Sequence, residues 1–205
     1  MDVQENRFAW VDEEDGFYPV LTFVEGATED EVIQCLGGDL RAVRLLTADE
    51  IYDLQPSHGL HRHRPFVSVG TAGSVVFALE LVGSTGAVPG VLRDLSRGGR
   101  CFGLLLDING GDRVQYAVDG HLVVYQEPRG AITPLREGDS RWNQAWCEGL
   151  IDVADPTQSW GLDLFLLAER VMGIVIERSW FTQPLRTVEL PDAIGSSNTP
   201  HWDIL

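Results

Sequence analysis

The sequence predicts an α+β fold, in which a mainly antiparallel sheet of about five strands, largely a meander, is packed by several helices on one face. Two observations predict this fold. Most of the β-forming residues lie in the stretch Pro65–Pro128, where Val- and Leu-rich runs alternate with glycine turns. Segments with apolar residues at helical spacing lie before and after this stretch, and one lies inside it.

The first part of the chain predicts one strand and two helices. Phe17–Gly26 is a run of Val, Leu and Phe that ends at a glycine, which is typical of a strand. Thr28 and Thr47 each stand three residues before a glutamate, the capping-box pattern that begins a helix. Between the two helices, we expect Asp39–Leu46 to be extended.

The stretch Pro65–Pro128 predicts five strands and one helix. Asp119-Gly120 separates the last two strands and is among the strongest short hairpin signals. Val88–Arg97 interrupts the strands, because its apolar residues fall at helical spacing. The expected strands are Phe66–Gly70, Ser74–Val82, Arg100–Ile108, Arg113–Val118 and His121–Gln126.

The last third of the chain predicts a long loop, a clear helix and a final extended stretch. Arg129–Arg141 contains Pro and Gly and is the longest candidate for a mobile region. A helix over Trp142–Ile151 would place its tryptophans in register. Gln158–Met172 has apolar residues at every third or fourth position, and Gly173 follows it, so we expect a helix there. Leu185–Leu190 is expected to be extended.

Length and composition indicate one domain with its own hydrophobic core. The chain has 205 residues, of which 44% are hydrophobic. We expect a single domain over residues 8–191, between a flexible N-terminus (1–7) and a flexible C-terminal tail (192–205). No apolar run approaches the roughly 20 residues that span a bilayer, and the N-terminus is acidic where a signal peptide is basic. We therefore expect a cytoplasmic protein.

The charge of the chain bears on its partners. The formal net charge is −16, and every basic residue is arginine. Binding to a phosphate backbone needs a basic surface, so we expect neither nucleic acid nor an anionic membrane as a partner. An acidic protein can instead bind a basic protein, and charge then steers their encounter. Plain solubility is the alternative explanation of the charge.

Three histidines, His58, His61 and His63, are the most conspicuous ligand-like cluster. Their spacing would allow one metal ion to be shared. Two arginines, Arg62 and Arg64, interleave with them and oppose a cation, so a solvated basic loop is favoured and a metal site is the alternative.

No catalytic motif is found. The loop Gly83–Gly90 lies where a phosphate-binding loop would lie, but it matches neither nucleotide-binding motif, so we expect a flexible connection. There is no G-x-S-x-G elbow, and the three cysteines are far apart without a C-x-x-C. We expect no cofactor and favour a protein that is not an enzyme. A small-molecule or metal sensor, or an enzyme with a site assembled from scattered residues, is the alternative; those residues are His58, His61, Asp107 and His121.

Our first functional hypothesis is a protein-binding module that recognises a basic partner, and its sharpest form is an immunity or antitoxin-like role. Tryptophan is enriched at binding hot spots, and we expect at the surface both the tryptophan beside the acidic run near the N-terminus and the one that follows the 129–141 loop. A structural subunit that dimerises through a sheet edge is a third possibility. The predicted partner-binding residues are Trp10, Asp12, Glu13, Glu14, Asp15 and Trp142.

The order of the elements adds a resemblance. The chain opens, from Phe8, with FAWVDEEDGFYPVLTFVEGATEDEVIQCLGGD and continues with LLTADE. It goes on with LRDLSRGGRCFGLLLDINGGDRVQYAVDGHLVVYQEP and the late helix LFLLAERVMGIVIERSW. In this order and pattern it resembles the DUF6461 family of mainly actinobacterial proteins, over roughly Phe8 to Leu190. The resemblance implies one α+β domain in a bacterial cytosol. It carries over no functional residue, because the family has no established activity, and the histidine loop and the 129–141 segment look individual to this chain.

Overall fold

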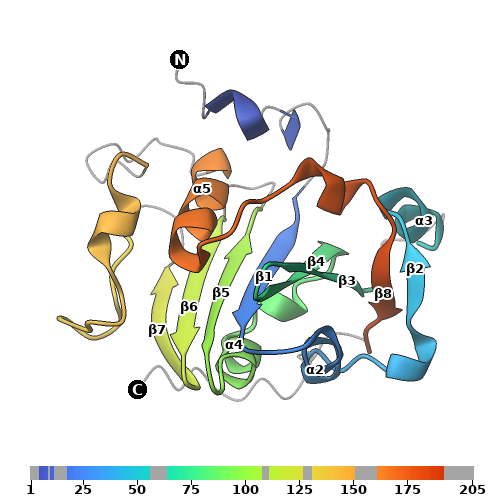
Figure 1. Cartoon of the computed structure of the whole chain (residues 1–205), viewed down its shortest axis with the longest axis horizontal. Helices are drawn as coiled ribbons and strands as arrows, with labels where there is room; N and C mark the ends of the chain where they lie inside the picture. Colours follow the sequence, from blue (N-terminus) through green and yellow to red (C-terminus); the bar gives the residue numbers. More distant parts are fainter. Residues whose placement is uncertain are drawn as a thin grey trace.

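An open, eight-stranded antiparallel sheet forms the centre of the protein (Figure 1). The structure is a computed structural model, and it describes residues 5–8, 10–11, 18–55, 64–107, 111–126, 131–150 and 161–191. The strand order is β2-β8-β3-β4-β1-β5-β6-β7. The strands are β1 (Val20–Glu25), β2 (Arg44–Leu46), β3 (Phe66–Ala72), β4 (Val75–Val82), β5 (Arg100–Leu105), β6 (Arg113–Val118), β7 (His121–Gln126) and β8 (Leu185–Glu189).

The sheet is larger than the sequence predicts. All five strands expected within Pro65–Pro128 are present, as β3 to β7. The expected strand and two extended stretches outside it become β1, β2 and β8. Because β1 lies between β4 and β5, and β8 between β2 and β3, only β5–β6–β7 form a run of three consecutive hairpin-connected strands. The prediction of about five strands, arranged largely as a meander, is therefore corrected to eight strands with two long-range insertions.

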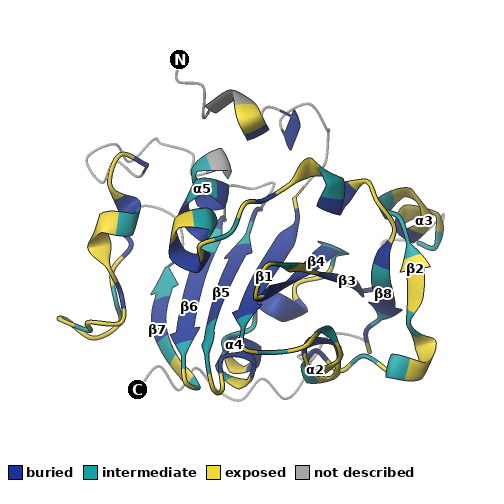
Figure 2. Ribbon diagram, in the orientation of Figure 1, coloured by how far each residue is buried: buried dark blue, intermediate teal, exposed yellow. Residues whose placement is uncertain are grey.

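Helices cover both faces of the sheet, which corrects the prediction that they lie on one. Four helices are described, namely α2 (Glu29–Cys35), α3 (Ala48–Asp53), α4 (Pro89–Leu95) and α5 (Gly161–Met172). The alternation along β4 separates the two faces. Phe77 belongs to the core cluster that includes α5, whereas Ala78 belongs to the cluster that includes α2 and α4. Figure 2 shows the central strands buried between these layers. Within the described residues no helix is long and apolar enough to cross a bilayer.

The two predicted capping boxes are confirmed. The Thr28 hydroxyl accepts a hydrogen bond from the Glu31 backbone N–H at 3.3 Å, and the Glu31 carboxylate accepts one from the Thr28 N–H at 2.7 Å. Thr47 and Glu50 form the same pair of bonds at the start of α3. These bonds satisfy backbone donors that a helix start would otherwise leave unpaired.

The segment 131–150 is anchored, although the sequence predicts a mobile loop over its first part. Ile132 is buried in the core, and the Leu135 N–H donates to the carbonyl of Val123 in β7 at 2.7 Å. The Arg170 guanidinium of α5 donates to the Glu148 carbonyl at 2.6 Å. The helix expected here is reduced to one 3₁₀ turn, η4 (Gln144–Cys147). This segment therefore lies along β7 and closes part of that edge of the sheet.

Candidate interaction surface

The two tryptophans expected at the surface are buried instead. Trp10 is 7% exposed and packs against Phe181, with ring centroids 4.9 Å apart. Trp142 is 6% exposed and packs against Tyr116 of β6 at 5.7 Å. The expectation of surface exposure fails because the N-terminal segment and the 131–150 segment both fold back onto the α5 side of the sheet. Neither indole is therefore exposed for contact with a partner.

Several other predicted site residues lie outside the described residues. These are the acidic run Asp12, Glu13, Glu14 and Asp15, and the histidines His58, His61 and His63. Their roles in partner or metal binding stay predictions. In the part of the chain that the structure describes, no group of three or more His, Cys, Asp or Glu side chains is placed to hold a metal ion.

Asp107 and His121, two members of the scattered-site hypothesis, do not converge. Asp107 follows the end of β5, beyond Leu105, which pairs with Arg113 at the start of β6. His121 begins β7 opposite Val118, at the other end of β6. The two side chains therefore lie near opposite ends of these strands and cannot share one ligand.

A buried carboxylate, Glu80, organises the loop between β4 and α4. The side chain is only 2% exposed. Its two oxygens accept backbone hydrogen bonds from Thr85 at 2.9 Å and from Gly86 at 2.6 Å, both in the turn η3 (Thr85–Ala87). On the far side of the turn, the Gln115 side chain donates to the Ala87 carbonyl at 2.6 Å. The loop is thus fixed to strands β4 and β6 and is not the flexible connection that the sequence predicts.

The same contacts close this loop to phosphate. A phosphate-binding loop works by pointing free backbone N–H groups at the ligand, and here two of these groups already bind the Glu80 carboxylate. A Cβ on Gly86 would lie 2.3 Å from the Thr22 hydroxyl oxygen, so the turn is packed directly on the sheet. Burial raises the pKa of Glu80, and this outweighs the lowering by the hydrogen bonds from Gly86 and Thr85. The hydrogen bonds of Glu80 and Gln115 therefore hold this loop against the sheet.

No described strand covers the outer edge of β2. β2 is the terminal strand of the sheet, and β8 is the strand that pairs with it among the described residues. Leu45, at its centre, is 68% exposed, and Figure 2 shows the strand exposed at the margin of a buried sheet. Open strand edges present unpaired backbone groups, and proteins commonly use them to bind an extended segment of another chain. This edge is our candidate interaction surface.

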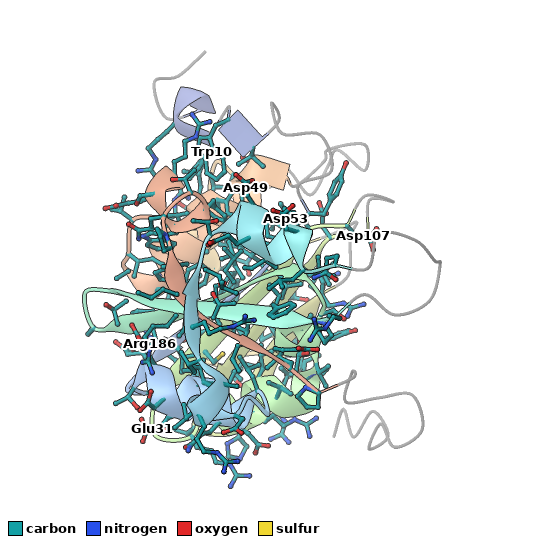
Figure 3. The ribbon with its side chains drawn as sticks, turned by 90° about the vertical axis from the view of Figure 1, so that its right-hand side faces the viewer. Trp10, Glu31, Asp49, Asp53, Asp107 and Arg186 are labelled. Atoms are coloured by element: carbon teal, nitrogen blue, oxygen red, sulfur yellow. The ribbon has the colours of Figure 1, made fainter. Side chains whose placement is uncertain are left out.

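Carboxylates frame this edge. α3 follows β2 directly, and its exposed face carries Asp49 and Asp53, which form no ion pair with any described residue. Figure 3 looks onto this side of the molecule and shows both aspartates toward one end of β2, with Glu31 of α2 toward the other. The sequence does not reveal this arrangement. α2 precedes β2 and α3 follows it along the chain, and only the fold brings their carboxylates to the two ends of the same strand (Figure 3).

Arg186 of β8 lies beside the edge and is shared by two acids. Its guanidinium bonds to Glu29 at 2.7 Å and to Asp30 at 2.6 Å, so two carboxylates face one cation. The hydrogen bond with Asp30, followed by the one with Glu29, raises the pKa of Arg186. The three side chains border an open depression of about 540 Å³, which Thr71 and Ser74 of the β3–β4 hairpin also line. The depression therefore keeps a negative surplus.

Six other described arginines are each paired with an acid of the protein itself, so these pairs add no net positive charge to the surface. The Arg141 hydrogen bond, for example, lowers the pKa of Asp139 to about 2. The pairs are Arg7–Glu169, Arg41–Asp39, Arg64–Glu189, Arg97–Asp94, Arg100–Glu25 and Arg141–Asp139. Arg44, on β2, is exposed and places one positive charge beside Asp49 and Asp53 of α3.

Comparison with known proteins identifies a family for this chain but no individual relative. The model of a family described as "Family of unknown function (DUF6461)" matches residues 1–158, which include strands β1 to β7. The match ends before α5 and β8, although the resemblance in the sequence extends to about Leu190. No curated protein and no solved structure matches the chain.

Proposed function

The chain belongs to the DUF6461 family, whose function is unknown, and we propose from its own surface that it binds a basic partner protein. The observation that carries this proposal is the β2 edge, which no described strand covers and around which carboxylates outnumber cations. Asp49 and Asp53 form no ion pair with a described residue, two carboxylates share Arg186, and Arg44 of β2 is the exposed cation at the edge. The exposed Leu45 supplies an apolar contact at the centre, and Asp49 and Asp53 supply charge at its side. Complementary charge of this kind speeds encounter and selects partners.

The sharpest form of the proposal is an immunity or antitoxin-like role, in which the acidic surface neutralises a basic effector. The net charge of −16 supports binding to a basic protein in preference to nucleic acid or an anionic membrane. The proposed contact surface is the β2 edge and not the surface around Trp10 and Trp142 that the sequence suggests, because both tryptophans are buried. The acidic run Asp12–Asp15 stays a second predicted contact.

The proposal is tested by affinity capture from a lysate of the cells that make the protein, at low and at high salt, followed by affinity measurements with the purified partner. We expect a stoichiometric basic protein that high salt releases. The double variant Asp49→Asn/Asp53→Asn should weaken its binding about tenfold, since each exposed charge pair contributes up to about 1 kcal/mol.

Two further variants make this test specific. Neutralising Asp12, Glu13, Glu14 and Asp15 together asks whether the acidic run contributes. Glu137→Gln/Glu148→Gln removes the same charge as the α3 variant from the exposed surface of the 131–150 segment, and it should leave the affinity within twofold of wild type. Equal losses in the α3 and control variants would show that charge acts without a defined surface. A partner that no acidic variant affects would refute the proposal.

A further inference from the structure

The backbone of β2 can accept another strand. The three residues of β2 pair with β8 as Arg44 with Thr187, Leu45 with Arg186 and Leu46 with Leu185. In an antiparallel strand, alternate residues direct their N–H and C=O groups toward one neighbour, and the residues between them direct theirs the other way. Part of the β2 backbone therefore points away from the sheet, where no described segment pairs with it.

The side chains beside this edge lie on one face. Leu45 is opposite Arg186, and Arg186 is opposite Val69 of β3, so all three side chains lie on the same face of the sheet. It is the face that α2 covers, because Arg186 bonds to Glu29 and Asp30 there. Strands lie about 4.8 Å apart, so a strand added to β2 would be about 10 Å from β8. A long basic side chain on it can reach over Leu45 toward the two carboxylates that Arg186 shares.

The charges favour a basic occupant over a second copy of this chain. A self-paired edge would bring together two molecules of formal charge −16 and two acidic α3 helices. A basic segment instead meets Asp49 and Asp53 of α3 at one end and, at the side, the Glu29–Asp30 pair, which Arg186 neutralises only in part. Arg44 of β2 opposes such a segment with one positive charge, and the carboxylates outnumber it. A three-residue edge offers only about two pairs of backbone hydrogen bonds, so the flanking side chains must supply much of the affinity.

We propose that an extended, basic segment of the partner protein adds to the sheet along β2, with an apolar side chain on Leu45 and Lys or Arg side chains two residues away, on the same face, directed at the framing carboxylates. This inference rests on the proposed function and specifies how the partner binds. Such strand addition takes its affinity from backbone hydrogen bonds and its specificity from alternate side chains.

The probe is the capped peptide Lys-Thr-Val-Thr-Lys, whose valine and two lysines share one face of a strand. The control peptide has the same charge, but prolines replace the valine and both threonines, and proline cannot donate to a strand ladder. Amide hydrogen exchange is followed in the full chain, with β7 as internal reference. At about ten times the Kd, the outward-facing amides of β2 should exchange about tenfold more slowly with the valine peptide, and the β7 amides should not change.

Variants assign the effect to Leu45. Leu45→Thr keeps a strand-forming residue but removes the apolar contact, and it should weaken valine-peptide binding by about fivefold or more. Val175→Thr is the matched control, because Val175 is also an exposed apolar residue (56%) and lies outside the β2 edge. It should bind the peptide like wild type.

The outcomes separate this inference from the proposed function. If both peptides bind alike and no β2 amide is protected, strand addition is refuted, while binding of basic ligands through charge stands. If neither peptide binds and no basic protein is captured from the lysate, both proposals fall. A peptide-free dimer that Leu45→Thr dissociates would assign the edge to a second copy and overturn the inference.

Discussion

At the scale of single residues, Glu80 is the most unusual group in the described structure. A carboxylate is almost never fully buried without a compensating charge, and Glu80 is held by backbone N–H groups of Thr85 and Gly86. In the sequence it is one acid in an apolar strand, at a position whose neighbours on the same face are Ala78 and Val82. This single acid among apolar residues is the sequence signal that indicates a buried polar cluster. The hydrogen-bond partners of Glu80 cannot be predicted from the sequence, because they depend on how the following loop folds back.

The pH dependence of stability tests this residue. Burial raises the folded-state pKa of Glu80 above its ordinary value of 4.5, so the folded protein binds this proton more tightly than the unfolded chain does. The free energy of unfolding therefore falls as the pH rises from 4.5 through the folded-state pKa, by about 1.4 kcal/mol for each unit of the shift. We expect the stability of wild type relative to Glu80→Gln to decrease over this window, as measured by urea unfolding.

The control for this measurement is Glu137→Gln, which removes an exposed carboxylate from the 131–150 segment. Because the Glu137 side chain is exposed, this variant should not reproduce the change that Glu80→Gln shows relative to wild type. A Glu80→Gln curve that runs parallel to wild type, or diverges with the opposite sign, would contradict the assigned direction of the shift.

At the scale of elements, the local signals in the sequence were reliable and the pairings were not. The capping boxes at Thr28 and Thr47 predicted both helix starts, because each box involves residues only three apart. The bond between the Ser68 and Thr187 hydroxyls, 2.8 Å long, joins strands β3 and β8 from distant parts of the chain. Alternation in a strand indicates which face a residue occupies, but it carries no information about which strand lies next to it.

The cap of α3 affects the candidate surface directly. Thr47→Ala removes the hydroxyl that accepts from Glu50, and a lost N-cap costs about 1 kcal/mol. Amides of α3 should then exchange about fivefold faster, if the loss falls on local opening of this helix. Thr28→Ala is the matched variant in α2, and each substitution should affect its own helix most. Faster exchange spread evenly over the sheet would contradict this local assignment.

At the scale of the whole molecule, the sequence predicts the α+β class better than it predicts the candidate surface. Five strands were evident from Val- and Leu-rich runs bounded by turns. The open edge at Leu45 was not, since β2 is only three residues long and its exposure depends on β8. The buried tryptophans were misjudged because a tryptophan next to acids in sequence can turn away from them in space, as Trp10 does toward Phe181.

The net charge of −16 makes the folded chain sensitive to salt. Self-repulsion destabilises a compact, highly charged protein, and raising the salt from about 0.01 M to about 0.1 M shortens the Debye length from about 30 Å to about 10 Å. We expect this change to stabilise the fold by about 1 kcal/mol, or about 2–4 °C in Tm. Sodium chloride and tetramethylammonium chloride should act equally. A larger effect of one cation would indicate ion binding in place of screening.

The position of β8 sets an order of events during synthesis. β2 is joined to the rest of the sheet through β8, and Arg44 pairs with Thr187 across most of the length of the chain. β2 is synthesised well before β8, but it has no place in the described sheet until β8 has left the ribosome. A partner that recognises this edge would therefore meet it only after β8 has been made. A truncated chain that lacks Leu185–Glu189 would therefore not form the β2 edge.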